Sequence, residues 1–103
     1  MDKTILVIGA TGTLGEPVAR HLKEDGFRVR VMTRDIHKAR GIFGETFDIV
    51  VGDVMDVGSL EEPLDGCFGV HISTAPPENE QMKVNNVVAA ASKKGLQRIT
   101  YVS

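Results

Sequence analysis

The sequence has 103 residues, of which 42% are hydrophobic and 25% are charged, and this balance is that of an ordinary globular domain. A net charge of −2 provides no basic surface for nucleic acid or an anionic membrane, and no apolar run reaches the length of a membrane span. The length predicts a single domain, residues 1–103. The single cysteine excludes an internal disulfide, so we expect a cytoplasmic protein. The charge and the lack of a long apolar run predict no nucleic-acid or membrane partner.

The first predicted element is a buried strand at residues 5–8, where three of four consecutive apolar residues are β-branched. Glycines at positions 9, 12 and 15 follow it directly, and from Leu14 onward the apolar residues take helical spacing. A strand, a glycine turn and a helix in this order form the context in which a glycine motif predicts dinucleotide binding.

Each glycine has its own physical role in such a turn. Gly9 allows the chain to reverse at the end of the strand, where a side chain would clash. Gly12 allows backbone N–H groups to approach a pyrophosphate, and the amino end of the helix adds a partial positive charge there. Gly15 allows the helix to lie close to the strand. The sequence therefore predicts a phosphate-binding turn, with a purely structural turn as the alternative.

Helices and strands alternate along the rest of the chain. We expect helices at residues 14–25, 35–41, 59–64 and 80–94, and strands at residues 28–33, 46–51, 68–73 and 97–103. Gly26 is expected to end the first helix, and Asp35 to cap the second. The last helix carries a broad apolar stripe, composed of Met82, Val84, Val87, Val88 and Ala91.

This alternation predicts an α/β fold, a Rossmann-like three-layer sandwich around a five-stranded parallel sheet in the order 3-2-1-4-5, truncated after the fifth strand. In that order a topological switch point lies between the first and fourth strands, next to the glycine turn. Ligands of such sheets bind at this point, at the carboxyl ends of the strands.

The segment Gly9-Ala10-Thr11-Gly12-Thr13-Leu14-Gly15 has the spacing Gly-x-x-Gly-x-x-Gly, in place of the standard Gly-x-Gly-x-x-Gly. It resembles the extended and atypical short-chain dehydrogenase/reductases, especially their NmrA-like and nucleotide-sugar-epimerase-like branches. The resemblance covers the whole chain. It implies a bound NAD(P) whose phosphates contact this turn, through Gly9, Thr11, Gly12, Thr13, Leu14 and Gly15.

Thr33 ends the second predicted strand and Arg34 follows it, where the adenosine ribose of a dinucleotide would lie. An acidic residue there favours the 2′-hydroxyl of NAD, whereas a guanidinium pairs with the 2′-phosphate of NADP. We therefore expect NADP(H) as the preferred cofactor, with NAD possible. Asp35 leaves alternatives open, because its carboxylate could bind the ribose, neutralise Arg34 or only cap a helix, and Arg34 could be a solvated charge.

Two further segments receive a role from the resemblance. Asp53 and Val54 match the place where the family contacts adenine, through a carboxylate and the following backbone N–H; the alternative is an aspartate in an ordinary turn. Thr74 and Ala75 follow the fourth strand, where the family's backbone flanks the ribose on the nicotinamide side.

Several other polar residues have open assignments. Asn85 and Asn86 could face inward and hold the end of the sheet by hydrogen bonds, or lie on the outer face of the helix. The histidines at positions 21, 37 and 71 have no metal or catalytic spacing, so we expect them to be structural or solvated. Cys67 is expected in a turn or the core. The sequence predicts no metal site and no catalytic residue.

The resembling enzymes carry a catalytic Tyr-x-x-x-Lys pair that these residues lack, since no lysine follows Tyr101 by four positions. We therefore expect the cofactor-binding, N-terminal part of an atypical short-chain reductase that transfers hydride between nicotinamide and a small carbonyl or alkene substrate. The alternative is a non-catalytic NmrA-like redox sensor that binds NAD(P) and a protein partner. In either case the fifth strand is an open edge, through which a homo-oligomer could form.

Overall fold

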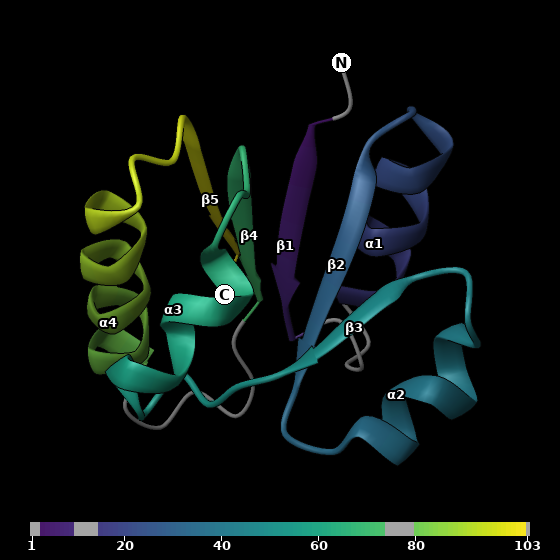
Figure 1. Ribbon diagram of the computed structural model, residues 1–103, viewed down its shortest axis with the longest axis horizontal. Helices are drawn as coiled ribbons and strands as arrows, with labels where there is room; N and C mark the ends of the chain where they lie inside the picture. The colour runs from purple at the N-terminus through teal and green to yellow at the C-terminus, as the bar shows by residue number, and fades with distance from the viewer. Residues whose placement is uncertain (1–2, 10–14, 74–79, 103) are drawn as a thin grey trace.

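Strands and helices alternate along the chain, as Figure 1 shows. The computed structural model describes residues 3–9, 15–73 and 80–102. The strands are β1 (Thr4–Ile8), β2 (Arg28–Thr33), β3 (Asp48–Val51), β4 (Gly69–Ser73) and β5 (Arg98–Val102). The helices are α1 (Gly15–Glu24), α2 (Ile36–Phe43), the 3₁₀ helix η1 (Val57–Leu60), α3 (Glu61–Leu64) and α4 (Glu80–Lys93).

The five strands form one parallel sheet in the order β3-β2-β1-β4-β5. The chain moves outward from β1 through β2 to β3, crosses back over the sheet, and moves outward again through β4 to β5. The predicted fold and strand order are therefore confirmed. The switch point lies between β1 and β4, where Ile8 pairs with Ile72 near the carboxyl ends of both strands.

Alternate residues of β1 enter two separate cores, because successive side chains of a strand point to opposite faces. Ile5 and Val7 pack on the face that α1 and α2 cover, in a cluster that includes Phe43. Leu6 and Ile8 pack on the other face with residues of η1, α3 and α4. Figure 1 shows these helices on opposite sides of the sheet, which gives the predicted three layers.

The segment between α2 and β3 departs from the prediction. The helix continues two residues past its predicted end, to Phe43, and the strand begins at Asp48 instead of residue 46. The rings of Phe43 and Phe47 lie 4.8 Å apart in one core cluster, so the chain must turn between them. Gly44 makes this turn with a φ of +66°. The two boundaries shift because Phe43 and Phe47 pack on each other in the core, and Phe47 therefore belongs to the turn and not to the predicted strand.

The predicted helix at residues 59–64 also takes a different form. The 3₁₀ helix η1 begins earlier, at Val57, and leads directly into the single turn of α3. Leu60 and Leu64 are fully buried and anchor both pieces against the sheet. A long helix is not needed here, because this segment only carries the chain from β3 across to β4.

The predicted apolar stripe of α4 is partly wrong. Val87 and Ala91 are buried, and so is Ala90, but Met82 is 52% exposed and Val88 is 38% exposed. Three buried residues form a narrow stripe, and Met82 and Val88 lie roughly 100° or more around the helix from its centre.

Among the described residues, no helix combines the length and apolarity that a membrane crossing requires.

Candidate functional site

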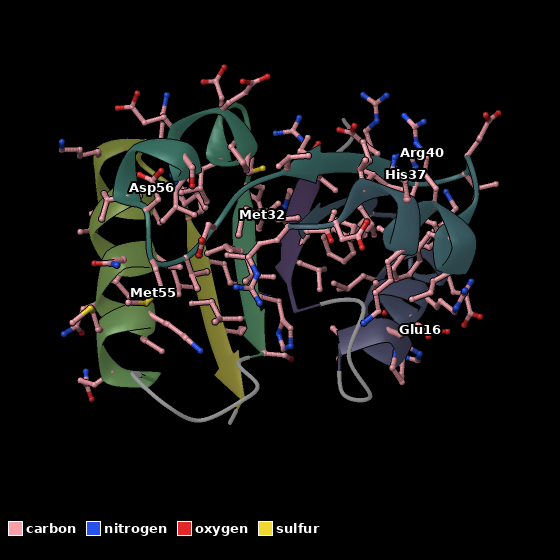
Figure 2. The ribbon with its side chains drawn as sticks, turned by 90° about the horizontal axis from the view of Figure 1, so that it is seen from below. Glu16, Met32, His37, Arg40, Met55 and Asp56 are labelled. Carbon is pink, nitrogen blue, oxygen red and sulfur yellow. The ribbon has the colours of Figure 1, made fainter. Side chains whose placement is uncertain are left out.

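A cavity of about 120 Å³ opens at the carboxyl ends of the central strands, beside the switch point between β1 and β4. In Figure 2, Met32 lies near the middle of the molecule and Met55 lies on the side of α4. The residues that line the cavity come from four strand ends and from α4: Ile8, Gly9, Met32, Arg34, Asp53, Val54, Met55, Ser73 and Lys83. This is the place where the strand order predicts a ligand.

Gly9 forms the wall of the cavity at the end of β1, and its surroundings require a glycine. Its φ is +86°, a conformation that side chains disfavour. A Cβ at this position would lie 1.9 Å from the carbonyl oxygen of Ser73 on β4. The structure therefore confirms that a side chain at position 9 would clash. The role of Gly9 in cofactor binding stays a prediction.

The remainder of the glycine turn (residues 9–15) is described only at its end. Thr11, Gly12, Thr13 and Leu14 lie outside the described residues, so their predicted contacts with a phosphate are not tested. Gly15 is buried and begins α1. Because α1 runs back along the sheet, its amino end lies at the same edge as the cavity and carries a partial positive charge there.

The end of β2 places three predicted residues in different environments. The Thr33 hydroxyl accepts from the backbone N–H of Asp35 and donates to its carbonyl, both at 3.0 Å, so the turn itself uses this group. The Asp35 carboxylate accepts from the N–H groups of His37 and Lys38. Asp35 therefore caps α2, which is one of the three roles that the sequence left open. Arg34 is exposed and lines the cavity, and no ion pair joins it to Asp35.

The end of β3 provides a half-buried carboxylate. Asp53 Oδ1 accepts from the backbone N–H of Met55 at 2.9 Å, and the Asp53 N–H donates to Ser59 Oγ at 2.9 Å. Asp53 therefore closes a turn, as the structural alternative predicts. Its second oxygen, Oδ2, has no hydrogen-bond partner among the described residues, and Asp53 and Val54 both line the cavity. The turn uses one oxygen and leaves the other available to a ligand.

The end of β4 contributes Ser73, while Thr74 and Ala75 lie outside the described residues. Ser73 Oγ lies 3.3 Å from Nε2 of His71, whose Nδ1 lies 2.7 Å from Thr100 Oγ1 on β5. Burial lowers the pKa of His71, which favours the neutral imidazole. His71 is thus a structural histidine with a hydroxyl partner at each ring nitrogen.

Two residues of α4 were not assigned to the site by the sequence. Lys83 lines the cavity, and the side-chain amide of Asn86 donates to the carbonyl of Val54 at 2.9 Å. Asn85 is exposed and accepts from Gln81 Nε2 at 3.0 Å, so the inward interpretation holds for Asn86 and the outer one for Asn85. A crossover helix that follows β4 begins at the ligand edge, and that signal could have identified a lysine in its first turns.

The other reactive residue types are not arranged for catalysis. Burial raises the pKa of the Cys67 thiol, although the Arg30 guanidinium acts in the opposite direction, so the thiol is a poor nucleophile. His21 and His37 are exposed, and His37 lies on α2, far from Met55 in Figure 2. Within residues 3–9, 15–73 and 80–102, no three His, Cys, Asp or Glu side chains form a group that could hold a metal ion.

The chain is similar to several known proteins. The model of the NmrA-like family matches residues 1–103. The NAD(P)H azoreductase of Xenophilus azovorans is 33% identical over 87 residues, which cover 84% of this chain and 30% of that protein. The dihydroflavonol 4-reductase of Dianthus caryophyllus is 28% identical over 121 residues, which cover 98% of this chain and 34% of that protein.

Among solved structures, the triphenylmethane reductase of Citrobacter sp., complexed with NADP(H), superposes with a TM-score of 0.83. It is 27% identical and covers 97% of this chain and 37% of its own. The chain spans about a third of the length of the curated relatives it matches.

Proposed function

Since the chain belongs to the NmrA-like family, we propose that it is the cofactor-binding part of an NAD(P)-dependent reductase, with NADP(H) as the preferred cofactor. The names of its relatives support this, because the azoreductase is named for NAD(P)H and the triphenylmethane reductase holds NADP(H). The observation that carries the proposal is the exposed Arg34 guanidinium at a cavity beside a glycine turn. The redox-sensor alternative, a cytoplasmic location and an oligomer formed through β5 stay predictions.

The donor and acceptor groups of the cavity fit the adenosine end of such a cofactor. Gly9 allows the end of β1 to lie against the Ser73 carbonyl of β4, where a Cβ would clash. Asp53 Oδ2 can accept from the exocyclic amine of adenine, and Arg34 can pair with a 2′-phosphate. Lys83 adds a second positive charge nearby. A dinucleotide is larger than this cavity, so its remaining parts are assigned to Thr11, Gly12, Thr13, Leu14, Gly15, Thr74 and Ala75.

This chain's own residues would bind and orient the cofactor. The bound nicotinamide would supply the hydride for a small carbonyl or alkene substrate. The amino end of α1 would stabilise the pyrophosphate, and Arg34 would select the phosphorylated ribose. We assign no catalytic residue within positions 1–103, since the Tyr-x-x-x-Lys pair of the resembling enzymes is absent from them.

Titration with NADPH and NADH tests this proposal. The wild-type chain is expected to bind NADPH more tightly. In Arg34→Ala the affinity for NADPH should fall about 10- to 100-fold, because a charge-assisted contact is lost, and the affinity for NADH should change less than about threefold. Arg28→Ala, an exposed arginine at the other end of β2, is the matched control and should leave both affinities unchanged.

Two results would contradict the proposal. Absence of saturable binding of either dinucleotide by the wild-type chain would refute cofactor binding. An equal loss of NADPH and NADH affinity in Arg34→Ala would refute selection of the 2′-phosphate, because NADH lacks that group.

A further inference from the structure

The loop that follows β3 forms one wall of the cavity and is tied to η1 on its far side. The hydroxyl of Ser59 accepts from the Asp53 N–H at 2.9 Å and lies within donating distance of the carbonyls of Asp53, at 3.0 Å, and Asp56, at 2.7 Å. The Asp56 N–H donates to the Asp53 carbonyl at 2.9 Å. These bonds hold the base of the loop but do not reach its peptide between Val54 and Met55.

That peptide is held from outside the loop by α4. Asn86 is half-buried, and its side-chain Nδ2 donates to the Val54 carbonyl at 2.9 Å. The N–H of the same peptide belongs to Met55 and donates to Asp53 Oδ1 at 2.9 Å. Because a peptide unit is planar, the bond that orients its carbonyl also orients its N–H. Asn86 therefore sets the direction of the Asp53 carboxylate through one rigid peptide.

We propose that Asn86 is the positioning residue for recognition of the nucleotide base, and this inference rests on the proposed function. Asn86 does not line the cavity, whereas Asp53, Val54 and Met55 do. With Oδ1 held by the Met55 N–H, Oδ2 is presented to the exocyclic amine of an adenine-type base. The chemical class that this arrangement selects is a purine with a donor at C6, and a base with an oxygen there would meet the carboxylate unfavourably.

The test compares NADPH with its hypoxanthine analogue, in which an oxygen replaces the adenine amine. The wild-type chain should prefer NADPH, and Asn86→Asp, which keeps the shape but removes the donor, should reduce the preference about three- to tenfold. Asn85→Asp carries the same charge one position away on the exposed side of α4. It should leave the preference unchanged within about twofold. Taking the ratio of the two affinities removes any general effect of the added charge.

Hydrogen exchange of the ligand-free protein tests whether Asn86 holds the peptide between Val54 and Met55. In Asn86→Ala, hydrogen exchange at the Met55 amide should be faster than in the wild type, and in Asn85→Ala it should be unchanged. Asn86 is absent from both core clusters, so Asn86→Ala is expected to fold.

The outcomes separate the inference from the function on which it rests. If the wild-type chain binds NADPH but Asn86→Asp keeps the full preference, or loses affinity for both ligands equally, the positioning role is overturned while cofactor binding stands. An unchanged Met55 exchange rate in Asn86→Ala would also overturn it. If the wild-type chain binds no dinucleotide, the proposed function fails and this inference fails with it.

Discussion

The two ends of the β-sheet each carry a hollow lined by arginine from the region of β2, but Arg30 at the amino end and Arg34 at the carboxyl end are used differently. At the amino end, a groove of about 500 Å³ is lined by Arg30 and Lys23. Arg30 donates to Asp48 Oδ2 and to the carbonyls of Pro63 and Asp65, each at 2.8 Å. Lys23 Nζ donates to a backbone carbonyl at 3.0 Å. The Arg30 guanidinium and the Lys23 ammonium, which line the larger hollow, are therefore groups that the fold already uses.

The carboxyl end has the smaller cavity, about 120 Å³, but it keeps uncommitted groups. Among the described residues, the Arg34 guanidinium and Asp53 Oδ2 have no hydrogen-bond or ion-pair partner. A ligand gains most from groups that have no protein partner to exchange, because a committed group would have to break one bond in order to form another. The candidate site is distinguished by Arg34 and Asp53 standing uncommitted beside the switch point between β1 and β4, and not by the volume of its cavity.

The largest expected effect tests whether the carboxyl end tolerates a side chain. In Gly9→Ala, the added Cβ meets the Ser73 carbonyl and the positive φ is strained, so we expect a loss of about 3 kcal/mol of unfolding free energy. Gly26→Ala at the amino end has a φ of +96° with nothing within 4 Å, and should lose only about 1 kcal/mol. Urea unfolding measures both. Equal losses would mean that the Ser73 contact relaxes without cost.

The next effect tests whether Arg30 stabilises the fold while Arg34 contributes to cofactor affinity. Arg30→Ala removes the donor to Asp48 and to the Asp65 carbonyl and leaves the Pro63 carbonyl with only the Cys67 thiol, so we expect a loss of about 2 kcal/mol of unfolding free energy. Its affinity for NADPH should stay within about twofold of the wild type. Arg34→Ala should show the reverse, with unfolding changed by less than about 0.5 kcal/mol. A stable Arg30→Ala protein with weakened NADPH binding would reverse the comparison.

The smallest effect concerns His71, a polar group in the middle of β4 that the fold does use. Burial holds the pKa of His71 below its ordinary value of 6.5, so the unfolded chain takes up the proton first as the pH falls. The stability that neutral His71 contributes is complete above pH 6.5 and is lost as the pH falls through the folded-state pKa. Between pH 7.5 and 5, the Tm of the wild type should drop a few degrees more than that of His71→Asn, on the order expected for a small domain.

His37→Asn is the matched control for this measurement. His37 is exposed on α2, so a slope that changes in His71→Asn more than in His37→Asn is assigned to the buried histidine and not to the loss of any histidine. Identical slopes for His71→Asn and the wild type would show that protonation of His71 does not oppose folding.

The sequence by itself determined the elements whose causes are local. The alternation of apolar and polar residues predicted β2 at its observed bounds, Arg28–Thr33, and Asp35 was predicted as the cap of α2. The strand order followed from the rules that govern parallel crossovers. Gly9 could be assigned because a glycine between a strand and a helix has few explanations other than a tight turn.

Only the tertiary structure decided which polar groups remain available. Asn85 and Asn86 are neighbouring residues of the same type, and the sequence does not tell them apart. Only Asn86 bonds to the loop after β3, because that loop packs on the side of α4 that carries Asn86. Arg30 and Arg34 likewise share one short segment, and Arg30 found partners because α3 ends beside it. Hydrogen bonds between residues 18 to 35 positions apart depend on how the chain closes, and no local pattern records that.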